Sequence, residues 1–215
     1  MSLQGKKILI TAGPTWVAID HVRVISNIAT GKTGIRLAEE ACARGAKVTL
    51  ILGPVGNIHL HRSITVKRFC YFNQLHSLIK TEMKRTKYDI VIHSAAVSDY
   101  KLRKAFDSKI RSNIKNFSLE LESTVKIVDK IKRYDPRVFL VIFKLELVIP
   151  RNQMIAKARA LMRESRADVA VVNTFNRRSA YKALVIDQNK TFFQVRSKEA
   201  LARNLFRLPV FIHKP

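Results

Sequence analysis

Short apolar runs alternate with segments of helical periodicity along most of the chain. The runs have the length and β-branched content of buried strands and occupy residues 8–10, 47–52, 88–96, 138–147 and 167–174. Residues 35–44 carry apolar side chains at helical spacing and stop at Gly45, and a second helix is expected from Asn73. Strands that alternate with helices imply a parallel sheet with ligands at the carboxyl ends of its strands. The pattern predicts an α/β, Rossmann-like three-layer domain.

The second half of the chain is less regular. Residues 101–115 form a basic stretch without a period, residues 117–121 alternate as a strand, and helices are expected at 124–133, 150–164 and 198–205. Residues 182–187 and 191–195, joined by three polar residues, predict a hairpin and thus a small antiparallel extension of the sheet. No repeat or linker interrupts the pattern, so one domain is predicted over residues 1–215.

Composition narrows the class of protein. No run of about eighteen uncharged apolar residues is present, so no membrane span is expected. The two cysteines are interpreted as reduced thiols of a cytoplasmic chain, and no Cys/His pair has the spacing of a metal site. Lysine and arginine total 40 against 16 acidic residues, a net charge of +24. Such a charge attracts anions, which include nucleotides, phosphorylated metabolites and nucleic acid.

The stretch from residue 8 to residue 34 carries the strongest chemical indication. An apolar strand stops in the turn T-A-G-P-T, and a helix departs from Gly31-Lys32-Thr33-Gly34. The free N–H groups and positive dipole of a helix N-terminus suit phosphate. However, Ser26 stands where a Walker A loop has its first glycine, and G-x-G-x-x-G is missing. The stretch predicts a phosphate site of neither standard type.

The order of T-A-G-P-T, I-D-x-V-R-x-I-S-N and G-K-x-G resembles phosphopantothenate–cysteine ligase, in its free-standing bacterial form, and the likeness covers nearly the whole chain. The resemblance implies amide formation between 4′-phosphopantothenate and L-cysteine through an acyl-nucleotide, with release of pyrophosphate. It implies CTP rather than ATP as co-substrate, Mg²⁺ on the triphosphate, and a homodimer. The apolar run at 138–149 also favours a dimer, if it is an exposed sheet edge. Relatives have Arg-Glu-Pro where this chain has Trp16-Val17-Ala18.

The resemblance also assigns roles to residues. The K-I-K motif corresponds to Lys109-Ile110-Arg111 and gives Lys109 a catalytic role at the nucleotide phosphates, while Asn27 of I-S-N would hold the acyl intermediate. Nucleotide binding is expected from the residues that match the remaining motifs: Gly13, Thr15, Gly31, Lys32, Ala95, Ala96, Asp99, Arg111, Lys126 and Phe143. Two lysines that hold the triphosphate in bacterial relatives correspond to Leu161 and Ser165.

Several alternatives stay open from the residues themselves. Asn27 is also suited to a helix cap or an Asx turn, Phe143 equally to the core, and Lys109 to a solvated loop. An NAD(P)-dependent Rossmann oxidoreductase is a rival, although the chain lacks its glycine fingerprint and an acidic residue after the second strand. A basic RNA-associated module is another. It lacks aromatic residues interleaved with the basic ones, so a nucleic-acid partner is not expected.

Overall fold

The computed structural model describes residues 2–147, 150–174 and 181–211. Its centre is an eight-stranded sheet. The strands, in their order across the sheet, are β12 (Thr191–Val195), β11 (Lys182–Ile186), β10 (Val169–Thr174), β9 (Phe139–Glu146), β6 (Ile90–His93), β1 (Lys7–Ala12), β4 (Lys47–Leu52) and β5 (Thr65–Arg68). All neighbours are parallel except β10, β11 and β12, which pair antiparallel. The predicted parallel sheet with a small antiparallel extension is confirmed.

The chain changes direction across the sheet at β1. It first proceeds from β1 to β4 and β5, and then returns to place β6 on the other side of β1. The carboxyl ends of β1 and β6 therefore flank the switch point of the sheet. In open α/β sheets this is the place where ligands bind.

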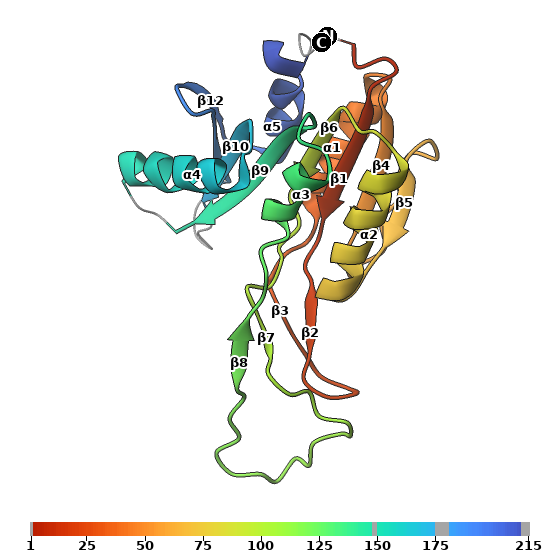
Figure 1. The fold of residues 1–215 in the computed structure, drawn as a ribbon, viewed down its shortest axis with the longest axis vertical. Helices are drawn as coiled ribbons and strands as arrows, with labels where there is room; N and C mark the ends of the chain where they lie inside the picture. Colours follow the sequence, from red (N-terminus) through yellow and green to blue (C-terminus); the bar gives the residue numbers. More distant parts are fainter. Residues whose placement is uncertain (1, 148–149, 175–180, 212–215) are drawn as a thin grey trace.

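Alternate residues of the strands enter two cores, one on each face of the sheet. The helices α1 (Lys32–Ala43) and α5 (Lys198–Leu205) cover one face, together with the 3₁₀ turn η1 (Pro209–Phe211). The helices α2 (Phe72–Arg85), α3 (Val128–Tyr134) and α4 (Arg151–Ser165) cover the other face (Figure 1). In β1, for example, Ile8 and Ile10 pack under α1 while Leu9 packs towards α2. This alternation produces the three predicted layers.

Four short strands form an arm that projects from the body (Figure 1). β2 (Trp16–Ala18) pairs with β3 (Val24–Ser26), and β7 (Tyr100–Leu102) pairs with β8 (Leu121–Ser123), both antiparallel. The arm therefore begins where β1 and β6 end. Its strands bury little, and all three residues of β3 and of β8 are exposed.

Some predicted elements are placed differently. The strand expected at 117–121 is wrong, since β8 begins only at Leu121, and the strand expected at 88–96 is confined to β6. The basic stretch 101–115 begins as β7 rather than as loop. β9 is an interior strand with β6 and β10 on its two sides, so it is no sheet edge. The edge argument for a dimer is therefore wrong, although the dimer itself stays a prediction. Among the described residues, no helix has the length and apolarity to span a membrane.

Candidate active site at the switch point of the sheet

Helix α1 starts unusually close to the ends of β1 and β6. A Cβ atom at Gly34, in the first turn of α1, would lie 2.5 Å from Ala12 Cβ and 2.6 Å from Ser94 Oγ. Gly31 precedes the helix with φ = +68°, and a Cβ there would lie 3.1 Å from Val55 Cγ1 and 3.4 Å from Gly13 N. These glycines let the positive end of α1 approach the switch point directly.

The segments that follow β1 and β6 lie side by side, because the two strands are parallel neighbours that end at the same edge of the sheet. The Ala96 N–H donates to the Gly13 carbonyl (2.9 Å), and the Thr15 N–H donates to the Ala96 carbonyl (3.2 Å). The Thr15 hydroxyl accepts from the Ser98 N–H at 2.9 Å. Thr15 and Gly13 are both buried. Thr15 therefore fixes the segment after β6 against the segment after β1, while its contact with the nucleotide stays a prediction.

Asn27 connects the arm to the same loop. Its Nδ2 atom donates to the carbonyls of Ala96 (3.1 Å) and Val97 (3.2 Å). The helix-cap alternative is excluded because Gly31 is the N-cap residue of α1. Both N–H groups of the amide are thus directed to the protein, and Oδ1 is the atom that remains for a ligand.

Ala95, Ala96 and Asp99 follow the carboxyl end of β6, beside the turn that follows β1, and we call this region at the switch point the crevice. Both alanines are half-buried and Asp99 is exposed. Thr124 holds the backbone of this segment from below, because its N–H donates to the Asp99 carbonyl (2.9 Å) and its hydroxyl donates to the Ser98 carbonyl (2.8 Å). No hydrogen bond or ion pair within the described residues engages the Asp99 carboxylate, which leaves it available to a ligand.

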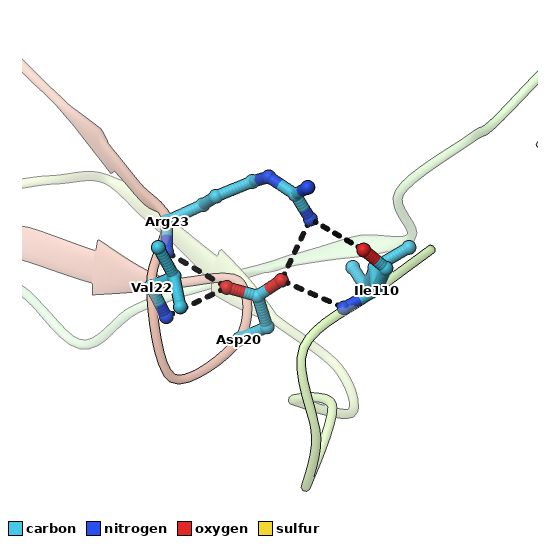
Figure 2. A network of polar contacts seen from close by, with 4 residues as sticks. All are labelled: Asp20, Val22, Arg23 and Ile110. Carbon is cyan, nitrogen blue, oxygen red and sulfur yellow. Dashed lines mark hydrogen bonds and ion pairs between the residues drawn. The ribbon is translucent and has the colours of Figure 1, made fainter. Parts of the chain in front are cut away.

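A buried aspartate fixes the position of the Lys109–Arg111 motif (Figure 2). One oxygen of Asp20 accepts from the N–H groups of Val22 (2.8 Å) and Arg23 (2.7 Å) in its own turn. The other oxygen accepts from the Ile110 N–H (3.0 Å) and from Arg23 Nη1 (2.8 Å), and that same Nη1 donates to the Ile110 carbonyl at 3.2 Å. Both backbone polar groups of Ile110 are thus held by the turn between β2 and β3.

The hydrogen bonds to Asp20 favour its charged form. The bond from the Ile110 N–H is the largest cause, and with the other donors it outweighs burial and lowers the pKa of Asp20 to about 2. Asp20 and Arg23 are the residues that the sequence analysis did not assign. The D-x-x-R spacing of a side-chain-capped turn was visible, but its partner Ile110 lies 90 residues further along the chain.

The remaining predicted residues differ in how they are placed. Lys109 and Arg111 flank Ile110 with exposed side chains, and Lys32 begins α1. Phe143 on β9 is half-buried and packs against the core on the α1 face, which is compatible with either interpretation of this residue. Lys126 is directed to the α2–α4 layer, where its Nζ lies 3.7 Å from Glu164. The structure therefore does not bring Lys126 together with the other predicted residues.

The crevice also contains a buried histidine on β6. His93 Nδ1 lies 2.9 Å from Thr11 Oγ1, which also accepts from the Ala95 N–H at 3.2 Å. Burial lowers the pKa of His93 to about 4, so the imidazole is neutral near pH 7. Its hydrogen bond joins β1 to β6 at the floor of the crevice.

The donors at the crevice fit a magnesium ion carried by a nucleotide better than an ion held by the protein alone. No group of three or more His, Cys, Asp or Glu residues that could hold a metal occurs among the described residues. Mg²⁺ is commonly bound through one or two carboxylates and substrate phosphates. Asp99 supplies one such carboxylate. A separate cavity of about 270 Å³, lined partly by Lys87, Arg137 and Phe139, lies at the opposite, amino ends of the strands.

The fold and the crevice define an α/β protein of the Rossmann-like class whose candidate site lies at the switch point of a mostly parallel sheet. The arm begins at that site and projects from it (Figure 1). Comparison with known families is more specific. The chain belongs to the family described as DNA/pantothenate metabolism flavoprotein C-terminal domain, whose model matches residues 3–209.

Individual relatives agree with this family. The chain is 40% identical over 174 residues to the coenzyme A biosynthesis bifunctional protein CoaBC of Thermococcus kodakarensis, which covers 80% of this chain and 42% of that protein. The protein of the same name from Bacillus subtilis is 37% identical over 67% of this chain and 35% of its own length. The chain thus spans less than half the length of these curated relatives.

Solved structures of the family share the fold. The crystal structure of the DNA/pantothenate metabolism flavoprotein from Streptococcus pneumoniae superposes with a TM-score of 0.85 at 26% identity, covering 94% of this chain and 97% of that one. The C-terminal domain of a coenzyme A biosynthesis bifunctional protein CoaBC gives a TM-score of 0.78 at 28% identity, with 95% and 94% covered. These likenesses extend over the sheet, its helices and most of the described chain.

Proposed function

We propose that this chain is a phosphopantothenate–cysteine ligase that uses a nucleoside triphosphate, CTP in preference to ATP. The main support for the proposal is a pair of hydrogen bonds at Ile110. Its N–H donates to Asp20, and its carbonyl accepts from Arg23. This contact joins the K-I-R motif to the hairpin that also carries Asn27. The I-S-N and K-I-R motifs, which are distant in sequence, thus belong to one arm, in a family whose curated relatives include coenzyme A biosynthesis proteins.

The proposed reaction has two steps. In the first, a carboxylate oxygen of 4′-phosphopantothenate attacks the α-phosphorus of the nucleotide, and the bond to pyrophosphate breaks. In the second, the amine of cysteine attacks the acyl carbon, nucleoside monophosphate leaves, and the amine loses a proton. Neither step needs a protein nucleophile. Both need fixed positive charge and donors where negative charge accumulates.

The predicted site residues suit these needs. Lys109 and Arg111, whose backbone the arm fixes at Ile110, would supply positive charge at the α-phosphate, where a pentacovalent transition state gains negative charge. The N-terminus of α1, with Gly31 and Lys32, provides N–H groups for phosphate oxygens. When bound, Mg²⁺ neutralises charge on the triphosphate, and Asp99 would hold it there. Asn27 keeps the arm closed on the 95–99 loop.

Pyrophosphate release tests the proposal. The purified protein is incubated with CTP or ATP and Mg²⁺, with and without 4′-phosphopantothenate, and product is identified by mass spectrometry after addition of cysteine. We expect pyrophosphate only with phosphopantothenate, amide only with cysteine, and a faster reaction with CTP. Pyrophosphate release at the same rate without phosphopantothenate would exclude the ligase function. Thermal stabilisation of the protein by NADPH, but by neither CTP nor ATP, would exclude it as well.

We further propose that the protein is a homodimer that associates through the arm. Phe106 and Phe117 lie with their ring centroids 5.7 Å apart in the loop between β7 and β8, and both are exposed. Leu121, on β8, is 48% exposed. An apolar strip of this kind on a projecting hairpin is typical of an interface. Multi-angle light scattering should give twice the mass of 24.6 kDa at micromolar concentration, and a monomer would refute the assembly.

A further inference from the structure

Two helices present their N-termini to the same edge of the sheet. The antiparallel strands β11 and β12 reverse the chain twice, so α5 leaves the sheet in the same direction as α1. The two helices pack side by side on one face, and Arg36 Nε of α1 lies 3.4 Å from Glu199 Oε1 of α5. The positive ends of both helix dipoles are therefore close to one another.

Each of these helices begins with a lysine. Lys32 is the first residue of α1 and Lys198 the first of α5. A cation at a helix N-terminus is unfavourable, and two neighbouring cations repel one another. Burial and, secondarily, the ammonium of Lys32 lower the pKa of Lys198, and the carboxylate of Glu199 opposes this shift. Within the described residues, neither ammonium has a hydrogen bond or an ion pair.

A tyrosine whose hydroxyl has no hydrogen-bond partner among the described residues lies beside Lys198. Lys198 Nζ is 5.7 Å from the centroid of the Tyr181 ring. The Tyr181 oxygen is buried and has no hydrogen-bond partner in the described part of the chain. Thr33 slightly opposes the rise in the pKa of Tyr181 that burial causes, but the two side chains do not form a hydrogen bond of normal geometry. A buried hydroxyl without an acceptor is rare in proteins and needs an explanation.

We propose that Lys198, Lys32 and the Tyr181 hydroxyl form the subsite for the terminal phosphates of the nucleoside triphosphate. This inference rests on the proposed function, because it assigns the phosphate tail of the same nucleotide. An anion between the two lysines would remove their repulsion, compensate both helix ends and accept the hydrogen bond of Tyr181. The subsite adjoins the crevice, since Lys32 follows Gly31, whose backbone lies against Gly13.

The subsite also supplies positive charge that two positions of helix α4 lack. The positions that correspond to triphosphate lysines of bacterial relatives are Leu161 and Ser165. Ser165 is buried and its hydroxyl donates to the Leu161 carbonyl at 2.6 Å, so neither of these two positions offers a cation to a phosphate. Lys198 comes from a different helix, on the opposite face of the sheet.

Isothermal titration calorimetry with inorganic tripolyphosphate, CTP and CMP tests the subsite in the wild-type chain and in Lys198→Gln. The control is Arg203→Gln, which removes the same charge from an exposed position of the same helix. We expect Lys198→Gln to weaken tripolyphosphate and CTP by about 10- to 100-fold, the range of a charged hydrogen bond, and to leave CMP unchanged. Lys198→Arg should restore most of the affinity, and Tyr181→Phe should cost about 3- to 10-fold.

The outcomes separate this inference from the proposed function. Wild-type protein that does not bind tripolyphosphate, or equal losses in Lys198→Gln and Arg203→Gln, would refute the subsite. Amide formation by Lys198→Gln with an unchanged KM for CTP would also refute it while leaving the ligase intact. Conversely, Lys198-dependent binding of tripolyphosphate in a protein that forms no amide would retain the subsite and remove the ligase. Circular dichroism of each variant checks that the fold is unchanged.

Discussion

Replacement of Gly34 by alanine should destabilise the protein, although alanine is the better helix former. In an open helix the change would stabilise by about 1 kcal/mol. Here the new Cβ would lie 2.5 Å from Ala12 Cβ, whereas carbon atoms normally approach to about 3.5–4.0 Å. Ala12 Cβ is fixed by the backbone of β1, and Ser94 Oγ, 2.6 Å from the new atom, donates to the Thr11 carbonyl. Helix α1 must therefore move away by roughly 1 Å.

The expected size follows from two opposing terms. Overpacking costs about 1–3 kcal/mol, and the upper end applies because neither neighbour can yield easily. After subtraction of the propensity gain of about 1 kcal/mol, the net loss is about 2 kcal/mol. For a chain of this size, that loss lowers Tm by about 4–8 °C.

Thermal unfolding followed by circular dichroism measures the effect directly. Gly56→Ala is the matched control, because a Cβ at Gly56 meets no atom within 4 Å. We expect the control to unfold with the wild-type Tm and Gly34→Ala to unfold clearly below it, with a weaker affinity for CTP because the N-terminus of α1 has moved. A Gly34→Ala variant as stable as the wild type would show that α1 does not depend on this close approach.

Three further predictions concern the crevice. Lys109→Gln should slow pyrophosphate release by about 10²–10³-fold, whereas Lys104→Gln, in the same loop, should leave the rate unchanged. Equal rates for the two variants in a stopped assay would show that Lys109 is an ordinary solvated lysine. Asn27→Asp should place a carboxylate against two carbonyl oxygens, so amide formation should fail while acyl-nucleotide accumulates in mass spectra, and unchanged turnover would contradict this. Burial lowers the pKa of His93 to about 4 in the folded protein, whereas the same histidine in the unfolded chain has a pKa of about 6.5. Acidification therefore protonates His93 in the unfolded chain first, and the free energy of unfolding decreases as the pH falls from about 6.5 to 4. Between pH 7 and pH 5 urea titrations should show a loss of about 2 kcal/mol in the wild type, and an identical loss in His93→Gln would exclude this origin.

Much of the fold was predictable because local pattern and layer packing agree. The apolar runs at 47–52 and 167–174 are strands, and residues 35–44 lie almost wholly in α1. The approach of Gly13 to Ala96 also followed from sequence, since both segments leave parallel strands at the same edge. Such inferences need only the period of the pattern and the topology of a parallel sheet.

The remaining features depend on contacts that no local pattern records. Residues 117–121 alternate like a strand, yet the partner β7 ends at Leu102, and its pairing places β8 at Leu121–Ser123. Lys126 was assigned to the nucleotide from its motif alone, whereas in the structure its ammonium forms an ion pair with Glu164 at 3.7 Å. Asp20 could be recognised as a turn residue, whereas its hold on Ile110 depends on how the arm folds back. In each case the outcome depends on a partner that is far away in the sequence, which the local pattern of side chains does not reveal.

The way in which Ile110 is held has a consequence for how the loop can vary. Asp20 and Arg23 bind its N–H and its carbonyl, and they do not depend on the side chain at this position. Residues 112–119 can therefore be lengthened, shortened or exchanged without moving the cationic side chains at 109 and 111. A single residue inserted between Lys109 and Arg111 would instead change the direction of one of their side chains relative to the other. Natural variation in chain length should thus accumulate beyond residue 111 and be absent from the three residues of the motif.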